Sequence, residues 1–180
     1  MSSPPKREYR YLDSDDDRRA LIEDIRQVRR DVLRMLEIVP KDKWYEPRYH
    51  GISLAAMLGH LQLMDSVTLW MMQLALIGVR LPGSAGLVNR FNDFMGRVFR
   101  QRVIETTVKG IQTKETALIS FVEKLPVEQF SKLVYHPVIE QYLTVEQAVQ
   151  EFFLFHWREH LASIRAVDDV RYEPPARDVL

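Results

Sequence analysis

Residues 152–167 read FFLFHWREHLASIRAV, and this stretch holds two histidines, His156 and His160, four positions apart. A helix turns about 100° per residue, so the two imidazoles lie about 40° apart on one face. The same face carries four further residues, Val149, Phe152, Ser163 and Val167. We therefore expect the helix to direct both imidazoles into the core, where each needs a hydrogen-bond partner or a metal ion.

A third histidine lies on a second predicted helix, which begins at Leu54 and which Ser53 is placed to cap. One face of this helix groups His60 with residues that are all apolar, Ala56, Met57, Met64, Val67 and Met71. We interpret the methionines as core filling. Asp65 and Gln62 lie about 140° and 160° from His60 on the helical wheel, so neither is expected to be a fellow ligand.

Three inward imidazoles from two helices predict a metal site formed by His60, His156 and His160. Burying them without partners would cost several kcal/mol, against a total stability of about 5–15 kcal/mol. Three neutral nitrogens suit zinc, nickel or copper, and they leave one coordination position open for water or substrate. The other two histidines, His50 and His136, fall in predicted loops, where we expect exposed or locally bonded side chains.

The remaining pattern predicts an all-α four-helix bundle. Ser14 is placed to cap a first helix that extends to Val39, because Pro40 follows. A third helical region is expected at about 91–125, with a kink or break near Gly96 or Gly110. Thr144 and Gln147 match a capping box, which opens a last helix that runs to about residue 167. No convincing strand pattern is present.

The bundle is expected to occupy residues 15–168, between a disordered N-terminal segment (1–14) and an extended C-terminal tail (169–180). The stretch GVRLPGSAG at 78–86 indicates a flexible connection or lid. Residues 125–143 indicate a proline-containing connection with a helical turn at 127–130. Four arginines near the third helix form either a solvated face or a site for an anionic substrate group, Arg90, Arg97, Arg100 and Arg102.

Composition narrows the classes of function. The 180 residues are 46% hydrophobic, which is enough for one good core and one domain. The 25 basic and 25 acidic side chains cancel, which argues against nucleic acid as a partner. The absence of cysteine excludes disulfides, thiolate ligands and cysteine nucleophiles. No apolar stretch is long enough to suggest a leader or a membrane span, so we expect a soluble, cytoplasmic protein.

The letters HWREH also match H-x-x-E-H, the inverted zinc-protease pattern, in which Glu159 would be the general base. That pattern resembles an early landmark of a much larger mixed α/β domain, with a glutamate ligand far downstream. Only 20 residues follow His160 here. The three-histidine interpretation therefore fits the chain better.

Three stretches together resemble the DinB family of metalloenzymes: PKDKWYEPRYHGIS at 40–53, LAAMLGHL at 54–61 and FFLFHWREHLASI at 152–164. The resemblance covers about residues 15–167. It implies a left-handed four-helix bundle, often a homodimer, with a divalent metal held at one end of the core by His60, His156 and His160. Better-known relatives include thiol-dependent S-transferases and an isomerase that uses a low-molecular-weight thiol.

We therefore hypothesise an enzyme that uses zinc or nickel to activate a thiol co-substrate or water, and that acts on a small molecule. The resemblance fixes neither the reaction nor a general base. A second hypothesis stays open, in which the bundle is not catalytic and the histidine cluster or its metal only stabilises the fold.

Overall fold

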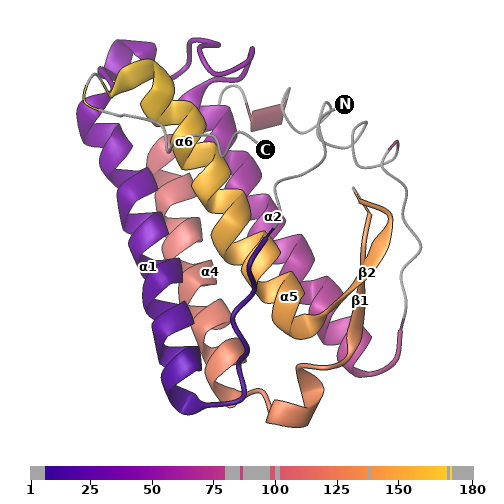
Figure 1. The fold of residues 1–180 in the computed structure, drawn as a ribbon. Helices are drawn as coiled ribbons and strands as arrows, with labels where there is room; N and C mark the ends of the chain where they lie inside the picture. The colour runs from indigo at the N-terminus through magenta and orange to yellow at the C-terminus, as the bar shows by residue number, and fades with distance from the viewer. Residues whose placement is uncertain are drawn as a thin grey trace, which may run out of the picture.

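The computed structural model describes residues 7–79, 86, 98–99, 102–137, 139–169 and 171. Within this part of the chain, four long helical segments form a bundle (Figure 1): α1 (Asp15–Ile38), α2 (Leu54–Leu76), α4 (Ile104–Lys124) and a last segment that starts with α5 (Val145–Gln150) and ends with α6 (His156–Asp168). α2 packs against α4, and α1 packs against both α4 and α6. The predicted all-α four-helix bundle is confirmed.

The predicted helix starts are confirmed by their caps. The Ser14 hydroxyl accepts a hydrogen bond from the Asp17 N–H at 3.1 Å, and the Ser53 hydroxyl accepts one from the Ala56 N–H at 3.2 Å. Thr144 and Gln147 form the complete capping box. Each cap satisfies backbone donors that the first helical turn leaves without partners.

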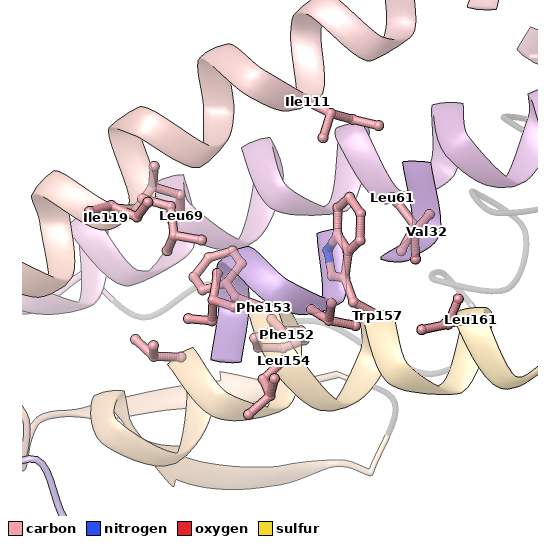
Figure 2. Packing of buried hydrophobic residues seen from close by; sticks show 14 of the residues in the cluster. Val32, Leu61, Leu69, Ile111, Ile119, Phe152, Phe153, Leu154, Trp157 and Leu161 are labelled. Carbon is pink, nitrogen blue, oxygen red and sulfur yellow. The ribbon is translucent and has the colours of Figure 1, made fainter. Parts of the chain in front are cut away.

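The core lies between the four segments, and Figure 2 shows apolar side chains from α2, α4 and the last segment packed together. The last segment buries the aromatic side chains of Phe153 and Trp157, both 0% exposed, in this core. Leu161 and Ile164, further along the segment, are buried as well. Burial of such side chains supplies most of the stability of a bundle this size.

The expectation of no strands is wrong. Two short strands, β1 (Leu133–His136) and β2 (Gln141–Thr144), form an antiparallel hairpin before α5, with Leu133 opposite Thr144. The hairpin packs against α5 and α2 (Figure 1). The predicted turn at 127–130 is confirmed as a short 3₁₀ helix, Val127–Gln129; another one, Lys41–Lys43, follows α1.

The last segment is also less regular than predicted. Residues Glu151–Phe155, between α5 and α6, form a π-helical turn, in which the His156 N–H donates to the carbonyl of Glu151, five residues back. The predicted third helical region is interrupted before α4, because Arg102 and Val103 are not helical, whereas α4 itself runs through Gly110 without a break. Gly110 instead lets α2 approach, because a Cβ at this position would lie 1.8 Å from Gln62 Nε2.

Residues 7–12, here called the N-terminal strap, lie against the last segment although the sequence predicted disorder. The Tyr9 hydroxyl donates to Glu151 at 2.6 Å, the Arg10 N–H donates to Gln150 at 2.8 Å, and Leu12 is 0% exposed.

Some predicted features lie outside the described residues: most of 78–86, most of the C-terminal tail, and Gly96, Arg90, Arg97 and Arg100. Arg102 is described, and its guanidinium lies over the Phe99 ring.

Candidate metal site

The three predicted histidines meet at one point. His60 lies in the second turn of α2, His156 is the first residue of α6, and His160 follows one turn later. The Nε2 atom of His156 is 3.3 Å from that of His60 and 3.0 Å from that of His160. One ligand atom from each residue lies within 4.8 Å of the others. Among the described residues, no other histidine, aspartate or glutamate joins this group.

These spacings fit a bound cation. Metal–nitrogen bonds of about 2.0–2.1 Å place two tetrahedral ligand nitrogens about 3.4 Å apart, and two neighbouring octahedral ones about 2.9 Å apart. The observed 3.0 and 3.3 Å lie between these two values. The rings are inclined to one another by 72–80°, so they meet edge to face and do not stack.

The protonation of the rings suits the same role. Burial, with a contribution from the neighbouring His160, lowers the pKa of His60 to about 4, and burial lowers the pKa of His160 to about 4. Burial and the surrounding histidines also lower the pKa of His156. The imidazoles are therefore neutral at pH 7. One proton between two Nε2 atoms can satisfy only one pair, whereas a shared cation would satisfy all three converging lone pairs.

The site lies at the edge of the core, which differs from the predicted orientation. All three histidines are half-buried, while the core-facing side of α6 is formed by Trp157, Leu161 and Ile164. On the predicted face, Val149 and Phe152 are buried, but Val167 is 48% exposed. Their half-burial gives the histidines contact with solvent as well as with the core.

The remaining histidines stay outside the group. His50 is exposed, as predicted, in a tight turn where it and Gly51 both have positive φ. His136 lies on β1 rather than in a loop, and its ring stacks on Phe152 with 4.7 Å between centroids. Its Nδ1 faces the N–H of Ile139 at 3.4 Å, a local contact of the expected kind. Burial lowers the pKa of His136 as well.

Glu159 does not behave as the inverted zinc-protease pattern would require. Its side chain is 55% exposed and pairs with Arg7 of the N-terminal strap. It is absent from the histidine group. Asp65 is absent from it too, in agreement with the helical-wheel prediction.

Asp65 instead belongs to a buried polar network that the sequence analysis missed. It forms an ion pair with Arg29 of α1, and both side chains are 1% exposed. Burial raises the pKa of Asp65, while Arg29 and the Trp157 N–H act in the opposite direction. One signal was available, since Arg29 follows Ile22 and Ile25 at helical spacing and so interrupts the apolar face of α1.

The described part of the chain contains no helix that is both long and apolar enough to span a membrane. No protein-family model matches the chain, and no curated protein matches it. One solved structure does match, YfiT from Bacillus subtilis, with a TM-score of 0.71 and 15% sequence identity over 89% of this chain and 91% of that chain. YfiT is described as a probable metal-dependent hydrolase with an unusual four-helix bundle topology. At this identity the likeness shows the fold, so the chain shares the YfiT four-helix bundle.

Proposed function

We propose that this chain is a divalent-metal-dependent enzyme in which His60, His156 and His160 hold zinc or nickel. The observation that carries the proposal is the convergence of three Nε2 atoms from two helices, with 3.0 and 3.3 Å separating His156 from its two neighbours. A divalent ion bound there would supply a Lewis acid that lowers the pKa of a coordinated thiol or water.

In this proposal the protein positions the three ligands, keeps them neutral and leaves one coordination position for substrate. α2 supplies one nitrogen and α6 supplies two, so the packing of these helices fixes the site. Burial keeps the rings neutral, which leaves their lone pairs free to bind. Three protein ligands leave a position for a substrate atom, and because the three histidines are only half-buried, we expect a small molecule to reach that position from solvent.

The proposal includes two nucleophiles. The resemblance to the DinB family favours a low-molecular-weight thiol, in a transfer reaction. The description of YfiT as a probable hydrolase favours water. A screen of common thiols with a chromogenic electrophile, run beside a set of chromogenic esters and amides without thiol, separates the two, because only the transferase requires the thiol for turnover.

The alternative is a structural site. Among the described residues no carboxylate joins the histidine group, so neither an acid or base for catalysis nor a fourth protein ligand for a closed structural site accompanies the three histidines. A structural metal is held by four protein ligands, whereas a catalytic one keeps an open position. X-ray absorption spectroscopy of the loaded protein decides between them, since an exchangeable oxygen ligand supports the enzyme and a fully protein-ligated ion supports the structural role.

The first experiment is elemental analysis of protein purified without a nickel column. We expect about one zinc or nickel per chain in the wild type and a loss of nearly all of it in His160→Ala. His50→Ala is the matched control, because His50 is exposed and outside the group, and it should retain the metal. Equal metal content in wild type and His160→Ala would contradict the proposal.

A further inference from the structure

A fully buried polar network lies next to the histidines. Arg29 Nη2 donates to both carboxylate oxygens of Asp65, at 3.0 and 2.9 Å. The Trp157 indole N–H donates to the same carboxylate at 3.0 Å, and the Arg29 guanidinium lies 4.3 Å from the centre of a Trp157 ring. Trp157 is 0% exposed, and the two charged side chains are 1% exposed.

Stability alone does not explain such a network. Taking an ion pair out of water carries a desolvation cost that its mutual attraction only partly offsets, and well-packed uncharged residues often serve the fold as well or better. Buried polar groups can instead fix the relative placement of the elements they join. The question is therefore which elements this network joins.

The network joins both helices that carry the histidines. Asp65 lies five residues after His60 on α2, and Trp157 directly follows His156 on α6. Arg29 also donates from Nη1 to the Phe153 carbonyl at 2.8 Å, inside the π-helical turn that immediately precedes His156. Arg29, on a helix without histidine, thus bonds to α2 through Asp65 and to the turn just before α6 through Phe153.

We propose that Arg29 and Asp65 are positioning residues for the metal site, which set α2 against the start of α6 so that the three Nε2 atoms converge. The inference rests on the proposed metal-binding function. Metal–ligand distances in working sites vary by only about 0.2 Å, so a shift of α2 along α6 by a fraction of a helical turn removes His60 from bonding range. The Arg29 guanidinium resists that shift more strongly than apolar contacts, which have no preferred direction, because Nη2 bonds to Asp65 on α2 and Nη1 bonds to Phe153 just before α6.

The test removes the network without leaving a buried charge. In Arg29→Met/Asp65→Asn, both charges are absent and the amide oxygen still accepts from Trp157. Val122→Ala is the control for general destabilisation, because Val122 is 0% exposed and lies on α4, which supplies no ligand. Arg29→Lys is a second variant, which keeps the charge but offers one nitrogen in place of the two that bond to Asp65 and Phe153.

Two quantities are measured for each protein: zinc and nickel affinity by chelator competition, and the imidazole NMR resonances of the metal-free form. We expect the double variant to bind about 10–100-fold more weakly, with Arg29→Lys in between and Val122→Ala unchanged. In the metal-free double variant, the His60, His156 and His160 resonances should shift while those of His50 stay in place.

The outcomes separate the two proposals. If the wild type binds no metal, the proposed function fails; the NMR comparison then still decides whether Arg29 and Asp65 position the rings. If the wild type binds metal and a folded Arg29→Met/Asp65→Asn or Arg29→Lys variant binds it equally well with unchanged imidazole resonances, the positioning role is overturned and the metal site stands.

Discussion

Arg29 and Arg30 are neighbours in α1, but their side chains lie in opposite environments. The Arg29 side chain is 1% exposed and pairs with Asp65, whereas the Arg30 side chain is 53% exposed and pairs with Glu23. The same residue type therefore contributes to the protein in two ways. The buried pair depends on hydrogen bonds from the surrounding protein, while the exposed pair is screened by water.

Arg29→Met is expected to lower the free energy of unfolding by about 3–5 kcal/mol, because it leaves the Asp65 carboxylate buried without its cation. Arg30→Met, one position along, should cost at most about 1 kcal/mol. Urea unfolding of the two variants beside the wild type measures both values. Similar losses in the two variants would show that the buried ion pair stabilises the fold no more than the exposed one.

At the level of elements, the helix starts were predictable because their signals are local. A capping side chain bonds to backbone within three residues, so Ser14, Ser53 and Thr144 could be recognised from sequence. The histidine group was predictable for a similar reason, since helical spacing alone places His156 and His160 together. Their meeting with His60 required two helices to pack, and it was inferred from the need of buried imidazoles for a partner.

The features that were missed depend on distant partners. The hairpin strands have only four residues each, and neither shows a clean alternation of buried and exposed positions. The π-helical turn has no local sequence signature. One of its carbonyls, that of Phe153, accepts a hydrogen bond from Arg29, 124 residues away in sequence, and neighbouring residues do not reveal such a partner. The helical wheel also assigned α6 the wrong core side, since Trp157, Leu161 and Ile164 form a second apolar face beside the histidines.

The capping box at the start of α5 gives a prediction at this scale. Thr144→Ala removes the hydroxyl that accepts from the Gln147 N–H at 3.2 Å, and it should lower the free energy of unfolding by about 1 kcal/mol. Thr113→Ala, at an exposed position inside α4, should change it by less than about 0.5 kcal/mol. Chemical denaturation compares the two, and equal effects would mean that the box adds nothing.

At the scale of the whole molecule, the N-terminal strap lies along α5 and the π-helical turn (Figure 1) and bonds to both. Leu12 is the buried anchor of the strap, and its carbonyl accepts a hydrogen bond from Arg18 at 3.1 Å. The strap therefore supports from outside the segment that places His156 and His160.

Leu12→Ala should lower the free energy of unfolding by about 2–5 kcal/mol, because it opens a cavity beneath the strap. The neighbouring Tyr11 is 76% exposed, so Tyr11→Ala should change it by less than about 0.5 kcal/mol. Thermal and urea unfolding of both variants check this. A negligible effect of Leu12→Ala would indicate that the strap is dispensable for folding.

The three half-buried histidines also make the stability of the whole metal-free protein depend on pH. In the folded state burial lowers the pKa of His60 and His160 to about 4, whereas in the unfolded chain histidine titrates near 6.5. Between these values the unfolded chain binds more protons, so acid favours unfolding. The neutral rings carry no penalty above about pH 6.5, and stability is lost as the pH falls from there towards 4.

Each of the two histidines should therefore contribute a slope of up to about 1.4 kcal/mol per pH unit in that window, with His156 acting in the same direction. Urea unfolding of the metal-free protein at pH 7.0, 6.0 and 5.0 measures the slope.

His60→Gln/His160→Gln is the control variant: it keeps polar side chains but removes two titrating groups, so its stability should depend less on pH over the same range. Both proteins contain the same carboxylates, including Asp65 with its raised pKa, so the difference between the two profiles reports the histidines. A wild-type profile that is flat from pH 7 to 5 would mean that the rings are solvated enough to protonate in the folded state.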